Sequence, residues 1–163
     1  MNALSIANGY RRNLPHIHVR ERPLFITYGT FRRWCLPPAA RTIALKHVLY
    51  AHIRQCFVHV VVIMPDHVHI VMTLPHALTA DARSFAAILK GIKGVSARRI
   101  NEFFGRRDHV WLVESFDRVV RRAEGLMSVC NYVIENPVRA GLASSPDEYP
   151  WLWRAWLEGR GVT

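Results

Sequence analysis

The order of sequence patterns predicts an α+β fold: a ferredoxin-like split βαβ antiparallel sheet with helices on one face, plus a C-terminal helix. Strand-like and helix-like segments follow one another in the order β–α–β–β–α–β–α, which is the split pattern with one helix added. The 163 residues amount to about one domain, and no change in composition divides them. We therefore expect a single domain over residues 1–163, with a basic N-terminal arm at 1–22 and a C-terminal extension at 143–163.

The first half of the chain predicts three strands and one helix. Leu24–Phe31 is rich in β-branched and aromatic residues, which favour a strand. Two prolines then begin a helix over Ala39–Gln55. The apolar runs Phe57–Met64 and His67–Leu74 are separated by Pro65-Asp66, which is typical of a turn, so they predict an antiparallel hairpin.

The second half predicts two helices with a short strand between them. Apolar residues recur at helical spacing from about Asp81 to Phe104. Val110–Glu114 (VWLVE) is typical of a strand, and a helix follows from about Arg118 to Glu135. Asn136-Pro137 should end that helix, because the residue before a proline avoids the α region.

The charge balance indicates a nucleic-acid partner. Lysine and arginine number 22 against 12 acidic residues, which gives a net charge of +10. Nineteen of the 22 are arginines, whose planar guanidinium can bind phosphate through two hydrogen bonds. A small basic domain rich in arginine therefore favours nucleic-acid binding, and the alternative is a solvated basic surface without a partner.

Composition excludes several other classes of protein. The longest apolar run, Phe57–Pro65, is far shorter than the ~20 residues that span a bilayer, so no membrane partner is expected. The N-terminus lacks the charged-then-apolar order of a signal peptide. Cys35, Cys56 and Cys130 are an odd number without CxxC spacing, which argues against a disulfide framework and fits a reducing cytoplasm.

A pair of histidines is a candidate metal site. Successive side chains of a strand alternate between its faces, so His67 and His69 share one face while Val68 points to the other. Two imidazoles at this spacing can converge on one ion. The alternative is a pair of partly exposed histidines hydrogen-bonded to neighbours. His16 and His18 have the same spacing in the N-terminal arm but no strand context, and we interpret them as phosphate or backbone contacts instead.

Two polar residues near the end of the last helix could join this site. Tyr132 and Asn136 are four residues apart, so they share one helix face, whereas Leu126, Cys130 and Val133 lie largely on another side. The alternatives are a packing role for Tyr132 and a helix-terminal role for Asn136. Motifs of nucleotide-binding loops, serine hydrolases and zinc proteases are absent from the sequence.

Five segments together resemble one family, the REP-associated tyrosine transposases, a branch of the single-tyrosine (histidine–hydrophobic–histidine) transposase superfamily. The resemblance covers about residues 11–153. The segments, in chain order, are RRNLPHIHVRERPLFITYGTFRR (11–33), MPDHVHIV (64–71), LKGIKGVSARRIN (89–101), VWLVESFDRVVR (110–121) and NYVIENPVRAGL (131–142).

The resemblance implies a metal-dependent endonuclease and strand transferase that acts on hairpin-forming (REP-like) single-stranded DNA, in DNA transposition or REP mobilisation. Tyr132 would be the nucleophile on the C-terminal catalytic helix and would form a 5′-phosphotyrosine intermediate. His67, His69 and Asn136 would bind a divalent metal, Mg²⁺ or Mn²⁺, with Glu135 as a fallback ligand. The covalent intermediate keeps the bond energy, so rejoining needs no ATP.

Basic and aromatic residues are the expected contacts to DNA. The candidate DNA-binding residues are Arg11, Arg12, Arg32, Arg33, Lys90, Lys93, Arg98 and Arg99. The candidates for base stacking are Tyr28, Phe31, Trp34 and Trp111, although core packing would account for at least half of them.

Three hypotheses follow, of which the transposase is the first. The second is a binding protein that recognises structured single-stranded DNA without cutting it. The third is a structural zinc protein, which two histidines and one amide would serve poorly. We expect a monomer or homodimer in the bacterial cytoplasm, associated with the nucleoid. The aromatic stretch Tyr149–Trp156 could pack over the sheet, contact DNA or cover a dimerisation surface.

Overall fold

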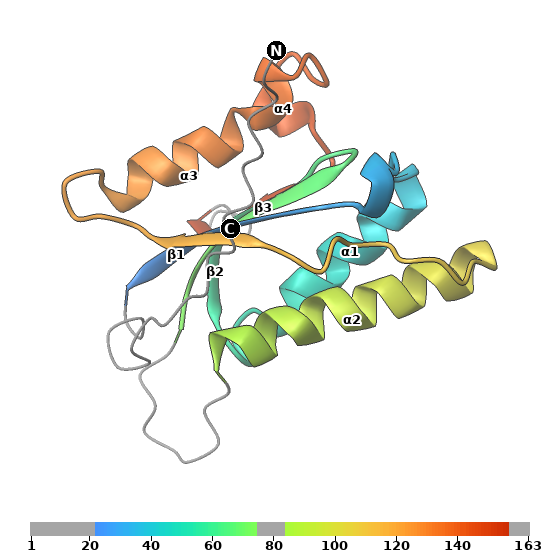
Figure 1. Cartoon of the computed structure of the whole chain (residues 1–163). Helices are drawn as coiled ribbons and strands as arrows, with labels where there is room; N and C mark the ends of the chain where they lie inside the picture. The colour runs from blue at the N-terminus through green and yellow to red at the C-terminus, as the bar shows by residue number, and fades with distance from the viewer. Residues whose placement is uncertain (1–21, 75–83, 157–163) are drawn as a thin grey trace, which may run out of the picture.

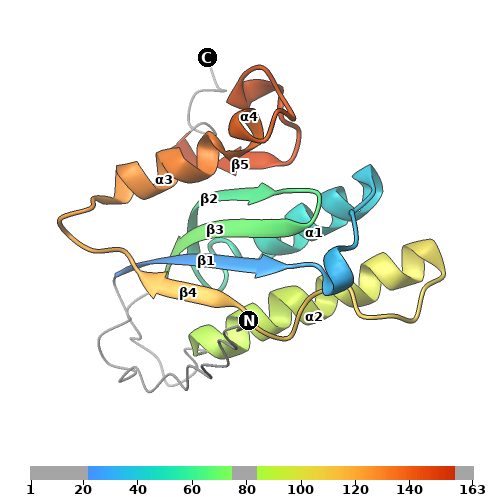
Figure 2. The same cartoon turned by 45° about the horizontal axis from the view of Figure 1, so that its top comes forward.

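A five-stranded antiparallel sheet forms the centre of the computed structural model, which describes residues 22–74 and 84–156 (Figure 1). The strands lie side by side in the order β4-β1-β3-β2-β5, as Figure 2 shows. Their bounds are β1 Pro23–Gly29, β2 Phe57–Ile63, β3 His67–Thr73, β4 Phe116–Val119 and β5 Leu152–Arg154. The first four strands have the ferredoxin-like order, so the predicted α+β fold is confirmed.

Two long helices cover one face of the sheet. They are α1 (Pro38–Ala51) and α2 (Phe85–Phe104), and Figure 1 shows both on the same side. Alternate residues of the three central strands point toward them, and the resulting core is built from Ile26, Tyr28, Val61, Ile63, Val68, Ile70, Ala44, Val48, Ile88 and Ile92. The remaining residues of each strand point to the opposite face of the sheet, where they form a second core.

The opposite face is partly covered by the C-terminal helices α3 (Leu126–Ile134) and α4 (Asn136–Arg139). The apolar side of α3 packs there through Val129, Cys130 and Val133, against strand residues that include Phe25 and Val71. This is the orientation that the apolar spacing of the helix predicts, and it leaves Tyr132 about half exposed at 47%. The second face therefore carries the C-terminal helix and the histidines.

The predicted strand at Val110–Glu114 is wrong, because the fourth strand is β4. Val110 and Trp111 are buried against α2 instead of joining the sheet, apart from one isolated bridge between Trp111 and Thr30. The indole N–H of Trp111 donates to Ser96 Oγ at 2.9 Å. Val110 and Trp111 therefore pack against α2, Leu112 and Val113 are exposed, and the more polar residues that follow pair with β1.

The last long helix begins later than the sequence predicts. Arg118 and Val119 belong to β4, and α3 begins at Leu126. The residue before Leu126 is Gly125, whose φ of +78° suits glycine far better than other residues. The predicted end is nearly right, because α3 stops at Ile134 and α4 begins at Asn136.

The helix α1 also ends before the predicted Gln55. It stops at Ala51, and Ile53 adopts a φ of +67° in the turn that leads to β2. The prediction for α2 holds from Phe85 onward. Residues 75–83, which include the predicted start of this helix at Asp81, lie outside the described part of the chain, as do residues 1–21 of the predicted N-terminal arm.

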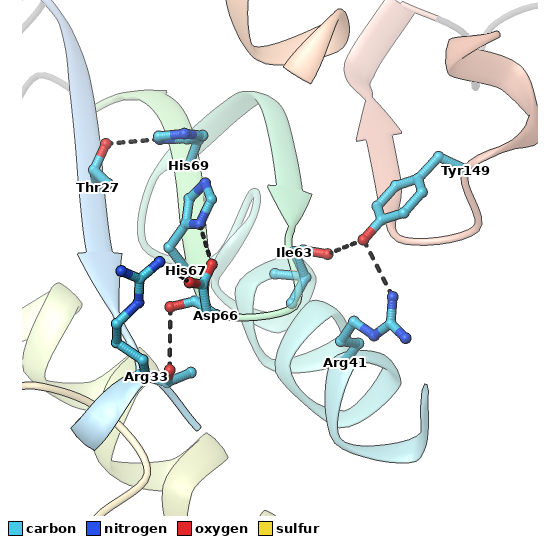
Figure 3. Close-up of polar contacts among 9 residues, drawn as sticks. Thr27, Arg33, Arg41, Ile63, Asp66, His67, His69 and Tyr149 are labelled. Carbon is cyan, nitrogen blue, oxygen red and sulfur yellow. Dashed lines mark hydrogen bonds and ion pairs between the residues drawn. The ribbon is translucent and has the colours of Figure 1, made fainter. Parts of the chain in front are cut away.

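The aromatic C-terminal stretch packs over the sheet, which is one of the three predicted roles. Its strand β5 pairs with β2, and the Tyr149 hydroxyl donates to the Ile63 carbonyl at 2.8 Å (Figure 3). The Arg41 guanidinium donates to Tyr149 Oη at 3.3 Å and lies 3.8 Å from the Trp151 ring centroid. The three cysteines are free, and no described helix is long and apolar enough to cross a membrane.

Candidate active site

His67 and His69 lie on the same face of β3, as strand alternation predicts. Their ring centroids are 4.7 Å apart. His69 is buried, with 7% of its surface exposed, whereas 30% of the His67 side chain is exposed. The Phe25 ring of β1 stacks on His69 with ring centroids 5.5 Å apart and covers one side of the pair.

Each histidine is held through its Nδ1 atom (Figure 3). His67 Nδ1 lies 2.7 Å from Asp66 Oδ1, and His69 Nδ1 lies 2.7 Å from Thr27 Oγ1. A carboxylate only accepts hydrogen bonds, so Nδ1 of His67 carries the proton and its Nε2 keeps a lone pair when the ring is neutral. This second layer of contacts is what fixes the orientation of histidines that bind metals.

The electrostatics of the site keep His69 neutral at neutral pH. Burial, together with the positive charges of His67 and Arg139, lowers the pKa of His69 from 6.5 to about 4. The hydrogen bond to His67 and the contact with Arg33 lower the pKa of the Asp66 carboxyl. Histidine binds a metal ion as a neutral imidazole, so the neutral state of His69 suits a metal ligand.

Tyr132 reaches this pair from α3. Its ring centroid lies 6.0 Å from that of His69 and 6.0 Å from that of Phe25. The buried residues Cys130 and Val133 hold α3 against the sheet. Tyr132 is about half exposed, and the buried part of its ring lies beside His69. The structure thus brings together three of the predicted site residues.

Asn136 and Glu135 follow one turn later, at the junction of α3 and α4. Asn136 is half-buried and Glu135 is exposed. Within the described residues, no hydrogen bond joins the Asn136 side chain to either histidine, and no three His, Cys, Asp or Glu residues cluster closely enough to hold a metal ion. The two oriented imidazoles fit a metal ion, and further ligands would have to be amide, water or substrate oxygens.

A model of the IS200-like transposases matches residues 40–136, which is more than half of the chain and includes His67, His69, Tyr132 and Asn136. The chain belongs to this family. Membership brings DNA binding and transposition as the general function of the family, and it agrees with the resemblance seen in the sequence. No curated protein matches the sequence.

Solved structures are similar to this family member, and those with TM-scores of 0.50 or more share its fold. A REP-associated tyrosine transposase bound to a REP hairpin has a TM-score of 0.70 at 19% identity, over 96% of this chain and 88% of that chain. A bacterial tRNA(His) guanylyltransferase-like protein in complex with GTP has a TM-score of 0.50 at 13% identity, over 86% and 74%. A putative transposase from Deinococcus radiodurans has a TM-score of 0.46 at 18% identity, over 82% and 97%.

One of the predicted DNA-binding arginines, Arg33, lies beside the histidine pair of this IS200-like transposase, whereas Arg32 contacts the Phe31 ring. Arg32 and Arg33 both adopt left-handed backbone conformations, with φ of 52° and 54°. The Arg33 side chain is 88% exposed, and its guanidinium lies 3.2 Å from Asp66 Oδ2. Arg11 and Arg12 lie outside the described residues, as do His16 and His18.

The other four predicted DNA contacts lie on α2, on the opposite side of the sheet. Lys93 donates to the Val113 carbonyl at 3.0 Å and to Ser115 Oγ at 2.9 Å, so it anchors the segment before β4. Arg98 and Arg99 both pair with Glu102, while Lys90 lines a groove beside the same segment. These residues do not join the histidine site.

The predicted base-stacking aromatics divide as expected between core and surface. Tyr28 and Trp111 are buried and contact each other at 5.1 Å between ring centroids. Phe31 and Trp34 are half-buried and contact the guanidinium groups of Arg32 and Arg106.

Several residues of the site escape a reading of the sequence alone. Thr27 pairs with His69 in the register of β1 and β3, so only the strand pairing reveals it. Asp66 is interpreted as a turn residue, although its position next to His67 is a usable signal. Two arginines also lie at the cluster: Arg118 lies 5.3 Å from the Phe25 ring centroid, and Arg139 lies 4.3 Å from that of Tyr132.

Proposed function

We propose that the chain is a metal-dependent transposase that cuts and rejoins hairpin-forming single-stranded DNA through a covalent bond to Tyr132. The observation that carries the proposal is the contact between the Tyr132 ring and His69 on the open face of the sheet. Family membership makes DNA the general substrate. A tyrosine beside two oriented imidazoles supplies a nucleophile and a place for a cation at one point of the surface.

The proposed reaction is a transesterification. The Tyr132 oxygen attacks the scissile phosphorus, the bond from phosphorus to the 3′-oxygen breaks, and the phenol proton ends on that oxygen as a 3′-hydroxyl. The DNA 5′-end is then joined to Tyr132 as a phosphotyrosine, and the reverse attack by a 3′-hydroxyl rejoins the strand. One phosphodiester replaces another, so no nucleotide cofactor is needed.

The chain's own residues prepare this step. Asp66 and Thr27 hold the two imidazoles by Nδ1, and Phe25 covers His69 and meets the edge of Tyr132. His67 and His69, with Asn136 as a third ligand, would hold Mg²⁺ or Mn²⁺, which would polarise the scissile phosphate.

The proposed substrate is a hairpin with a single-stranded flank. The solved REP-associated transposase of the same fold is bound to a REP hairpin, and we extend that ligand class to this chain. A groove of about 830 Å³ lies beside the site and includes Thr27, Phe116, Arg118 and Arg121 in its walls. Its walls carry two arginines and also Glu114 and Asp117, and its apolar lining suits an unpaired base.

The test uses single-stranded hairpins taken from the DNA that flanks the gene. The full chain is incubated with each hairpin and Mg²⁺ or Mn²⁺, and a denaturing gel is examined for an SDS-resistant protein–DNA adduct. We expect an adduct with the native chain and none with Tyr132→Phe, which should still bind the hairpin. Tyr50→Phe is the control, because Tyr50 is 60% exposed on α1, away from the histidines.

The outcomes separate cleavage from binding. An adduct in Tyr132→Phe would disprove the assignment of the nucleophile, and an adduct formed equally well in EDTA would disprove the role of the metal. A hairpin-specific shift on a native gel without any adduct would favour the alternative, a protein that binds structured DNA without cutting it.

A further inference from the structure

The guanidinium of Arg139 contacts Tyr132 in two ways. Its Nη2 donates to the Tyr132 carbonyl at 2.6 Å. Its central carbon, Cζ, lies 4.3 Å from the centroid of the Tyr132 ring, within the range of a cation–π contact. The Arg139 side chain therefore contacts both the backbone and the ring of Tyr132, the residue that carries the proposed nucleophile.

The helical path of the chain explains why Arg139 reaches back to Tyr132. The two residues are seven apart, which brings them to the same side of a helix two turns apart. Glu135, between α3 and α4, keeps a right-handed helical conformation with φ −79° and ψ −7°. Pro137 is buried, which anchors the first turn of α4 to the body of the protein. Long side chains on a helix point toward its N-terminus, as Arg139 does here.

Arg139 is also a cation without an acidic partner among the described residues. Arg118, the other arginine at the aromatic cluster, is bound by both carboxylate oxygens of Glu124 at 2.6 Å each. No carboxylate pairs with Arg139 in the described part of the chain, and its side chain is exposed. Most of its N–H donors are therefore available to an anion beside the Tyr132 ring.

We propose that Arg139 is a further functional residue, which holds the Tyr132 ring in place and binds the phosphate that becomes joined to the tyrosine oxygen. This inference rests on the proposed function. During the transfer, negative charge on the phosphate oxygens lies next to the phenol, and a fixed guanidinium stabilises it by hydrogen bonds. Arg139 stays protonated throughout, so it gives and takes no proton.

A purely structural role would be different. The Tyr132 carbonyl is among the last four of α3, which lack partners within the helix, and arginine commonly caps such carbonyls. That cap needs a hydrogen-bond donor but no charge, and its loss would lower the melting temperature. The positive charge serves the ring contact and the phosphate but not the cap, so glutamine and lysine at this position distinguish the structural role from the proposed one.

The experiment compares three variants of the full chain in single-turnover hairpin cleavage. Arg139→Gln keeps a hydrogen-bond donor without charge, and Arg139→Lys keeps the charge. Arg54→Gln is the matched control, because Arg54 makes the same pair of contacts with Tyr50, at 3.3 Å to its carbonyl and 4.5 Å to its ring centroid. Hairpin affinity on native gels and the melting temperature are measured for each protein.

We expect Arg139→Gln to cleave about 100-fold more slowly than the native chain, with hairpin affinity and melting temperature nearly unchanged. Arg139→Lys should recover part of that loss, and Arg54→Gln should cleave normally. If the native chain forms the Tyr132 adduct and Arg139→Gln forms it at the same rate, the inference is overturned while the proposed function stands. If the native chain forms no adduct on any flanking hairpin, both are overturned.

Discussion

At the scale of single residues, the site depends on side chains that hold other side chains. His69 can bind a metal ion only as a neutral ring. Burial behind Phe25 keeps the ring neutral at pH values well below its ordinary pKa of 6.5. Thr27 replaces some of the hydrogen bonding that burial removes from the ring. The surroundings of His69 therefore favour the neutral ring, which can bind a metal ion through the lone pair of a nitrogen, over the protonated ring.

The lowered pKa of His69 predicts a specific loss of stability in acid. The unfolded chain takes up a proton at this residue near pH 6.5, but the folded chain does so only near pH 4. Stability from this difference is complete above pH 6.5 and is lost as the pH falls toward 4, because the unfolded state binds more protons there. This difference amounts to roughly 3 kcal/mol.

Urea unfolding of the native chain and of His69→Gln at a series of pH values measures this effect. His47 and His59 also have lowered pKa values and contribute to both proteins alike. The native chain should therefore lose about 3 kcal/mol more than the variant between pH 6.5 and pH 4. Parallel curves for the two proteins over this range would contradict the buried, neutral state of His69.

At the scale of secondary structure, the sequence predicts elements best where the pattern and the packing agree. The hairpin of β2 and β3 and the helix α2 lie close to their predicted places. Their apolar residues are buried in the core that the sheet forms with the helices, so the sequence pattern and the packing agree. Val110 and Trp111 mislead because they are buried against a helix. The start of α3 is misplaced because Arg118 and Val119 form an edge strand, which helical spacing cannot exclude.

The candidate site shows the same limit. His67, His69, Tyr132 and Asn136 are visible in the sequence through strand alternation, helical spacing and family resemblance. Thr27 enters through the pairing of β1 with β3, which is set by the whole sheet. Arg139 has a local signal in its seven-residue distance from Tyr132, but only the three-dimensional contact gives that spacing a meaning.

The glycine that precedes α3 predicts how strictly this helix is placed. Gly125 has a φ of +78°, so an alanine there would strain the turn that leads into the helix. We expect Gly125→Ala to lower the free energy of unfolding by about 1–2 kcal/mol. Urea denaturation monitored by circular dichroism measures this change.

Gly91 in α2 provides a control with the opposite sign. A Cβ added at Gly91 meets no heavy atom within 4 Å, and the residue is not among the glycines with positive φ. Gly91→Ala should therefore raise the free energy of unfolding by about 0.5–1 kcal/mol, because alanine loses less entropy in a helix. If both variants were equally stable, the left-handed turn before α3 would not be what fixes its start.

At the scale of the whole molecule, the sheet separates two kinds of basic residue. Those on α2 bind protein groups on one side, as Lys93 does with Val113 and Ser115. Arg33 and Arg139 lie with the histidines and Tyr132 on the other side. A net charge of +10 draws DNA from a distance, but the side of the sheet that carries the site should determine where the backbone is held.

The salt dependence of hairpin affinity tests this division. Each phosphate contact to a single strand contributes about 0.7 to the slope of log affinity against log salt, and a contact to a duplex contributes about 0.9. Because Arg33 is highly exposed next to Asp66 and His67, we expect Arg33→Gln to reduce the slope by about one such contact and to weaken binding similarly for all hairpins. Arg54→Gln, which removes an arginine that stacks on Tyr50 of α1, should leave the slope unchanged. Equal slopes for the native chain and Arg33→Gln would mean that the DNA backbone does not pass over this edge of the histidine site.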